Sequence, residues 1–177
     1  MSECDITLSD KLREFLDSVE RDKIMSSDEL ERLLDFAVCL ARDYFAHAGE
    51  IRPHWIMQRA DGSVVDMWLS NQPTGGRVLD MPQCRKDEVA AILAKQFIAH
   101  DAVRYAFIAE AWQGSPNSSI PPSLDPNRIE IVQVVAENRE RGIGAAMEII
   151  RPAGQKLYLS KPKQHYPTAG RLTGLLH

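Results

Sequence analysis

Four glutamates, Glu110, Glu130, Glu137 and Glu148, lie in the most strand-like part of the sequence, and carboxylates are the ligands that divalent cations prefer. If Val103–Trp112 and Arg128–Glu137 pair antiparallel across the segment between them, a symmetric closure places Glu110 opposite Glu130. Two adjacent carboxylates repel each other unless a metal, a shared proton or a base lies nearby. These two residues, with Glu148 on the next strand, therefore form a candidate divalent-metal site for hydrolysis.

The same carboxylates also have a simpler interpretation. Arg104 and Arg128 share the predicted face of Glu110 and Glu130, so a solvated face of mixed charge would account for all four residues. The 5 histidines of the chain lie outside this set and show no ligand spacing such as His-x-x-x-His. We keep the metal site as an alternative and expect no resident cofactor.

A second candidate is the run Arg139-Glu140-Arg141-Gly142-Ile143-Gly144. It resembles the acyl-CoA loop of GNAT-type N-acetyltransferases, which reads Arg/Gln-x-x-Gly-x-Gly/Ala. In that family, backbone amides between a strand and a helix bind the pyrophosphate. The resemblance implies a strand before the loop and a helix after it. The cofactor-binding positions that it implies are Arg141, Gly142, Ile143 and Gly144.

The same run also suits a turn between antiparallel strands, because it is polar and contains glycine. Pro152 would end the helix after two turns, and the 25 residues that follow it are too few for the rest of an acetyltransferase fold. In the hairpin interpretation, which we prefer, the residues that face the core are Ile143, Ala145, Met147 and Ile149.

The elements that must position these residues begin with two one-sided helices. The first is predicted over residues 8–19. The second begins with the capping-box pair Ser26 and Glu29, continues with apolar residues at helical spacing from Leu30 to Phe45, and ends at Gly49. Neither helix would be stable alone, so each must pack on another part of the chain.

A hairpin and a third helix follow. Asp61-Gly62 between the strand-like runs His54–Arg59 and Val64–Leu69 predicts a tight turn. The third helix should run from about Cys84 to His100. Its inward residues should be Val89, Ile92, Leu93 and Phe97.

The remainder of the chain reads as strands. Val103–Trp112 and Ile129–Glu137 are strand-like, and Gln113–Asn127 is a proline-rich loop. A short strand is expected over Lys156–Ser160. The order α-α-β-β-α-β-β-β-β predicts an α+β fold, with a mainly antiparallel sheet covered on one face by helices.

Length and composition favour one globular domain. The 177 residues, 44% hydrophobic and 26% charged, suit a single domain over 1–177. Within it we expect a helical front (1–50), a sheet with one helix (51–160) and an extended tail (161–177). No apolar run approaches the roughly 20 residues of a membrane span, and the acidic first residues do not resemble a signal peptide, so we expect a cytoplasmic protein.

Charge is unevenly distributed along the chain. Residues 1–50 carry 13 acidic and 6 basic residues, a balance of −7, and residues 51–177 carry 12 and 15, a balance of +3. Such asymmetry is compatible with a symmetric homodimer, whereas the total of −4 argues against nucleic acid. The 3 cysteines form no Cys-x-x-Cys pair, and Cys39 should be buried on the apolar face of its helix.

A wider resemblance covers Val103–Arg151. The segments that carry it are Tyr105–Trp112, Pro121-Pro122-Ser123, Pro126-Asn127-Arg128-Ile129-Glu130 and Val134-Val135-Ala136-Glu137. Together they are similar to a family of small uncharacterised bacterial and phage-associated proteins. The resemblance implies a strand, a proline-rich loop and a strand that ends in Ala-Glu before a turn, which favours the hairpin. It implies no activity, ligand or catalytic residue.

The preferred function is a non-enzymatic, cytoplasmic binding or assembly module whose partner is another protein or a second copy. The first alternative is a diverged acyl-CoA-dependent N-acyltransferase, and the second is a divalent-metal-dependent hydrolase. A helix over 143–151 would favour the acyltransferase. A strand there, with Glu110 beside Glu130 and neither paired with arginine, would favour the hydrolase.

Overall fold

The structure is a computed structural model that describes residues 29–68, 83–115, 119–165 and 174–176. In these ranges the chain forms two helices and a seven-stranded antiparallel sheet. The helices are α2 (Glu29–Ala48) and α3 (Gln83–Ala99). The strands are β1 (His54–Arg59), β2 (Val64–Trp68), β3 (Ala102–Gln113), β4 (Ile129–Asn138), β5 (Gly142–Ile150), β6 (Tyr158–Leu159) and β7 (Lys163–His165).

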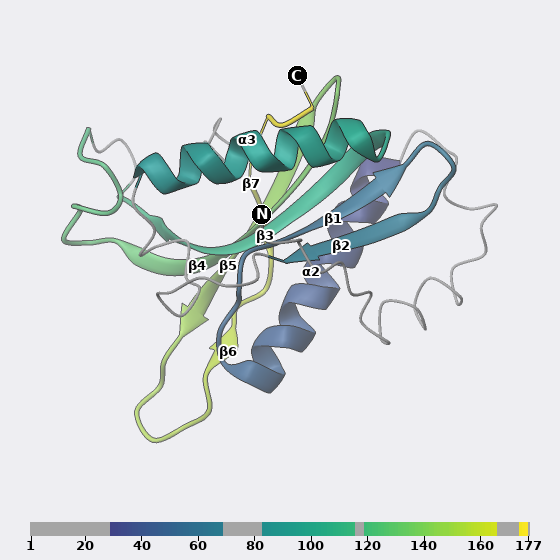
Figure 1. Cartoon of the computed structure of the whole chain (residues 1–177). Helices are drawn as coiled ribbons and strands as arrows, with labels where there is room; N and C mark the ends of the chain where they lie inside the picture. The colour runs from purple at the N-terminus through teal and green to yellow at the C-terminus, as the bar shows by residue number, and fades with distance from the viewer. Residues whose placement is uncertain (1–28, 69–82, 116–118, 166–173, 177) are drawn as a thin grey trace.

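The predicted α+β class with a mainly antiparallel sheet is confirmed. The strands lie in the order β2-β1-β3-β4-β5-β6, and β7 pairs with β5 beside β6. The expectation that helices cover one face is wrong, because α2 and α3 lie on opposite faces (Figure 1). Both sets of alternating strand residues therefore point into a core, and the solvated face expected around Glu110 does not exist.

Helix α2 has the one-sided pattern that the sequence indicated. Its apolar stripe packs on β3, β4 and β5, and the buried residues are Leu30, Leu33, Leu34, Ala37, Val38, Leu40, Ala41 and Phe45. Gly49 ends the helix as predicted, with a φ of 73° and its amide 2.8 Å from the Phe45 carbonyl oxygen. Cys39 is exposed, so the prediction that it is buried is wrong. Ser26 and the predicted helix over residues 8–19 lie outside the described residues.

The predicted hairpin forms from β1 and β2. Gly62 has a φ of 82°, and its amide donates to the Arg59 carbonyl oxygen at 3.0 Å. Asp61 Oδ1 accepts hydrogen bonds from the Ser63 hydroxyl and from the Ser63 amide, the latter at 2.8 Å, and these bonds lower the pKa of the Asp61 carboxyl. The hydrogen bonds that hold this turn therefore come from its own residues, as the Asp-Gly pair indicated.

Helix α3 packs on the other face of the sheet, against β1, β2 and β3. Val89, Leu93 and Phe97 are buried there as predicted, but Ile92 is 54% exposed. The apolar cluster beneath α3 includes Trp55 stacked on Phe107, with ring centroids 4.8 Å apart. Ile92 points outward because the sheet contacts one side of the helix, and the 3.6-residue repeat places it beyond that side.

The proline-rich loop between β3 and β4 is organised around Asp125. This carboxylate is buried and accepts hydrogen bonds from the Ser115 amide at 2.6 Å and the Asn127 amide at 2.8 Å. These backbone bonds lower its pKa. The charged form of Asp125 therefore fixes the two ends of the loop relative to each other.

The ambiguous segment after the loop is a strand. β5 pairs antiparallel with β4, and Glu137 lies opposite Gly142 next to the connecting turn. Ala145, Met147 and Ile149 are buried in the α2-side core, as the hairpin interpretation predicted. β6 and β7 then pair with the outer edge of β5, where the Ser160 amide donates to the Glu148 carbonyl oxygen at 2.9 Å.

Candidate functional site

Four connections meet at one end of the sheet and border an open hollow of about 810 Å³. They are the first turn of α2, the β1–β2 turn, the junction between α3 and β3, and the β4–β5 turn. The charged side chains that line it are Glu29, Asp101, Arg104, Arg139, Glu140 and Arg141. We call it the end hollow. Its lining carries three positive and three negative groups.

The β4–β5 turn forms one wall of the end hollow and is held by Asn138. Asn138 Oδ1 accepts hydrogen bonds from the Glu140 amide at 2.9 Å and the Arg141 amide at 2.8 Å. The Asn138 amide in turn donates to the Arg141 carbonyl oxygen at 3.0 Å. These amides are satisfied within the turn, so the wall offers the exposed side chains of Arg139, Glu140 and Arg141 to a ligand.

The four residues implied by the acyl-CoA resemblance belong to this turn and to β5. Arg141 lies in the turn, Gly142 begins β5, Ile143 packs on the α2-side core, and Gly144 is buried opposite Val135. The strand-to-helix junction that the resemblance required is not formed here, because a strand follows the glycines. The amides of Glu140 and Arg141 bind the Asn138 side chain, and the turn does not cradle an anion in the way the acetyltransferase loop does.

Two ion pairs tie two of the three arginines of the end hollow to α2. Arg104 on β3 pairs with Glu29, and both side chains are largely covered. Arg141 Nη2 lies 3.7 Å from Glu31 Oε1 in a more exposed pair. The start of α2 is thereby fixed to the sheet on one side and to the β4–β5 turn on the other. These pairs therefore link the position of α2 to the shape of the end hollow.

A smaller hollow of about 330 Å³ adjoins the first and shares Ala60 and Asp101 with it. Arg59 Nη2 donates a hydrogen bond to His100 Nδ1 at 2.8 Å. An arginine carries only donors, so His100 Nδ1 is the acceptor of this bond. Asp101 has a φ of 50° where α3 passes into β3, a left-handed conformation that aspartate tolerates better than most residues.

The three predicted metal-ligand candidates are not brought together. Glu110 lies opposite Val132, and Glu130 lies opposite Trp112, so the assumed register was wrong by two residues. Glu148 lies opposite Ile131 and points to the other face of the sheet. Glu130 binds Arg151, with 2.8 Å to Nε and 2.6 Å to Nη2. Within the described ranges no three His, Cys, Asp or Glu side chains form a metal-binding group.

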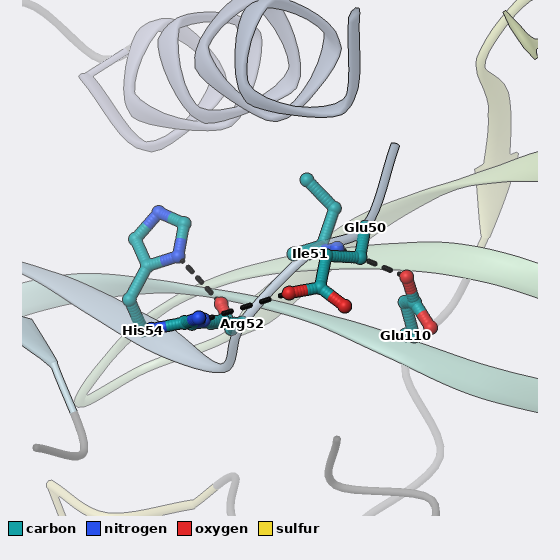
Figure 2. Close-up of polar contacts among 5 residues, drawn as sticks. All are labelled: Glu50, Ile51, Arg52, His54 and Glu110. Carbon is teal, nitrogen blue, oxygen red and sulfur yellow. Dashed lines mark hydrogen bonds and ion pairs between the residues drawn. The ribbon is translucent and has the colours of Figure 1, made fainter. Parts of the chain in front are cut away.

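Glu110 belongs instead to a buried polar layer that the sequence did not indicate. It is 2% exposed, and its Oε1 accepts a hydrogen bond from the Ile51 amide at 2.9 Å (Figure 2). The strand register places His54, Gln58 and Asp66 on the same, α2-facing side of the sheet, and all three are buried. Polar residues at alternate strand positions normally indicate a solvated face, so the sequence offers no signal that they are inside.

His54 is the residue of this layer whose protonation the structure defines. Its Nδ1 lies 3.0 Å from the Arg52 carbonyl oxygen, so Nδ1 carries the proton and donates it (Figure 2). Burial lowers the pKa of His54 to about 4, although the bond to Arg52 opposes this shift. The Tyr44 ring meets the imidazole edge-on at a centroid distance of 5.4 Å. The imidazole is therefore neutral at pH 7.

Comparisons with protein-family models, curated proteins and solved structures found no significant match to this chain. Among the helices in the described part of the chain, none is long and apolar enough to cross a membrane.

Proposed function

We propose that this chain is a non-enzymatic, cytoplasmic binding module that takes up a charged segment of a partner protein in the end hollow. One observation carries the proposal: the hollow is lined by arginines and acidic residues in equal number, and in the turn that forms one wall the Glu140 and Arg141 amides are already hydrogen-bonded to Asn138. Recognition then depends on side chains. A polypeptide segment that carries both charge signs complements such a lining better than a simple anion or cation does.

The rigidity of the site supports the same function. The end hollow is bounded by two strand turns and the start of a helix, and the Arg104–Glu29 pair links the helix to the sheet. A wall that is already ordered loses little conformational entropy when a partner binds. The exposed thiol of Cys39 suits a reducing compartment, which is consistent with the cytoplasm.

The test is fluorescence anisotropy with three short labelled peptides: one of alternating glutamate and lysine, one of glutamate alone and one of lysine alone. The mixed peptide should bind most tightly. Arg139→Glu should weaken this binding about tenfold, because it turns an exposed attractive charge of the wall into a repulsive one. Arg52→Glu is the matched control, since it reverses a 68% exposed arginine on the segment that joins α2 to β1. Equal loss in both variants, or no preference for the mixed peptide, would refute the proposal.

Thermal unfolding with small ligands separates the proposal from the two enzymatic alternatives. A ligand at about 100 times its dissociation constant stabilises a protein by about 2.7 kcal/mol, which raises the midpoint measurably. Stabilisation by acetyl-CoA that is lost in Gly142→Asp would replace the binding module with an acyltransferase. Stabilisation by Mg²⁺, Mn²⁺ or Zn²⁺ that is lost in Glu110→Ala would favour the hydrolase.

A further inference from the structure

Helix α3 is apolar on two sides. Its inner side contributes Val89, Leu93 and Phe97 to the core. Its outer side carries Ile92, 54% exposed, and Ile98, 78% exposed. Among the large hydrophobic side chains of the described residues, Ile98 is the most exposed. Two large apolar side chains are thus exposed on one side of this helix, whereas the exposed apolar residues that are normal on a soluble protein are scattered singly.

Small residues and charges complete this outer surface. Ala91 and Ala99 are exposed on it, so another helix could approach the backbone closely. Glu88 is exposed near the start of α3, and Lys95 is exposed two turns later on the same side. We call Glu88, Ala91, Ile92, Lys95 and Ile98 the α3 patch. Acid at one end and base at the other give it a polarity along the helix axis.

We propose that a second copy of this chain docks on the α3 patch, with the two α3 helices antiparallel and the two-fold axis between Ala91 and Ile92. This position of the axis is set by charge, because it lies midway between Glu88 and Lys95 in the sequence. Each Lys95 then faces Glu88 of the other copy, and Ile92 of both copies meets at the centre. A two-fold axis is the symmetry that lets one patch complement itself.

The size of α3 sets the strength of the contact. A helix of 17 residues is about 25 Å long and about 10 Å wide. The area of its outer side is therefore well below the roughly 800 Å² that each partner buries in a standard interface. The dimer is therefore a weak one, in the micromolar range, and populated only as concentration rises. It does not depend on the end hollow, whose charged turns lie outside the patch.

Sedimentation velocity of the full chain, up to about 300 µM, tests the dimer. We expect a monomer–dimer equilibrium whose dissociation constant rises at least tenfold in Ile92→Glu, because two like charges would meet at the axis. Leu124→Glu is the matched control, since it changes a 70% exposed apolar residue on the β3–β4 loop and should leave the equilibrium unchanged. A chain that stays monomeric throughout, or a dimer that Ile92→Glu does not weaken, would overturn the proposal.

A charge swap tests the antiparallel arrangement. Glu88→Lys and Lys95→Glu should each weaken the dimer, because each places like charges opposite each other. The double variant should restore it, since both pairs re-form with reversed sign. A double variant weaker than either single variant would refute the arrangement. A chain that binds the mixed-charge peptide without dimerising would support the end hollow and overturn this inference alone.

Discussion

The two faces of the sheet are buried in different ways. Under α2 the core includes a row of polar side chains, His54, Gln58, Asp66 and Glu110, while the helix itself is apolar only toward the sheet. Under α3 the core is aromatic and aliphatic, built around the stack of Trp55 on Phe107, while the helix carries isoleucines on its outer side as well.

This difference separates two kinds of stability. Apolar burial under α3 depends on area and is nearly independent of pH. Burial of titratable groups under α2 depends on hydrogen bonds and on protonation, so it specifies one arrangement at the cost of sensitivity to acid. Each of the following measurements strengthens or removes this distinction, and the largest expected effect comes first.

Truncating the aromatic core should have the largest effect. Trp55 is fully buried and stacked on Phe107, so Trp55→Ala should lower the free energy of unfolding by about 3–5 kcal/mol. Trp55→Phe should cost far less, because it keeps a ring and removes an indole N–H that has no hydrogen-bond partner among the described residues. Urea unfolding of both variants is the measurement. Similar losses in both would mean that this core does not depend on the ring stack.

Acid should act through the α2 side. The pKa of His54 is about 4 in the folded protein, against the ordinary histidine value of 6.5, so the unfolded chain takes up the proton first as pH falls. The contribution of neutral, buried His54 to the free energy of unfolding is complete above pH 6.5. It is lost between about pH 6.5 and pH 4, a decrease of about 3 kcal/mol.

Urea unfolding across this pH range, in the wild type and in His54→Gln, measures that contribution. Between pH 6.5 and pH 4, the free energy of unfolding should fall by about 3 kcal/mol less in the variant than in the wild type. His47→Gln is the control, because it makes the same substitution at an exposed histidine of α2. An unaltered slope in His54→Gln would remove the distinction between the two faces.

Glu110 should matter through its hydrogen bond to the Ile51 amide. Glu110→Ala leaves the buried Ile51 amide without its acceptor, at a cost of about 2 kcal/mol. Glu110→Gln keeps an acceptor oxygen and should cost about half as much. Thermal unfolding at pH 7 distinguishes them, and equal losses in Gln and Ala would show that the negative charge, and not the acceptor oxygen alone, is required.

The smallest effect is expected at the Arg104–Glu29 pair between β3 and α2. Both side chains keep 18% of their surface exposed, so Glu29→Gln should lower stability by about 1 kcal/mol or less, and by less still at high salt. Chemical unfolding at two salt concentrations is sufficient. If the loss of stability in Glu29→Gln is the same at both salt concentrations, this ion pair behaves like the buried polar layer and not like an exposed pair.

Local sequence signals predicted most of the elements. The apolar repeat and Gly49 located α2, Asp61-Gly62 located the first hairpin, and the clustered prolines located the loop before β4. Each of these signals acts within a few residues, through a turn conformation or a one-sided repeat. The sequence favoured a strand over β5, because Pro152 would end a helix there after two turns, but it left the helix open as an alternative.

Features set by distant parts of the chain could not be predicted. The pairing of β3 with β4 differs from the symmetric expectation by two residues, and such a shift leaves each side chain on its own face, so the apolar pattern cannot detect it. The burial of Glu110 and His54 required α2 to cover a face that reads as solvated. The charged lining of the end hollow comes from four separate connections, and no sequence spacing links them.

Both margins of the sheet are protected, which bears on how the protein behaves when concentrated. Uncovered strand edges act as templates for amyloid-like growth. Here β6 and β7 cover β5, separated by Ser160-Lys161-Pro162, and proline has no amide hydrogen with which to extend a ladder. At the opposite margin, β2 is only 5 residues long and turns Asp66 inward, two features that disfavour pairing with another chain. Fibril formation would therefore require partial unfolding first, and the intact fold resists it.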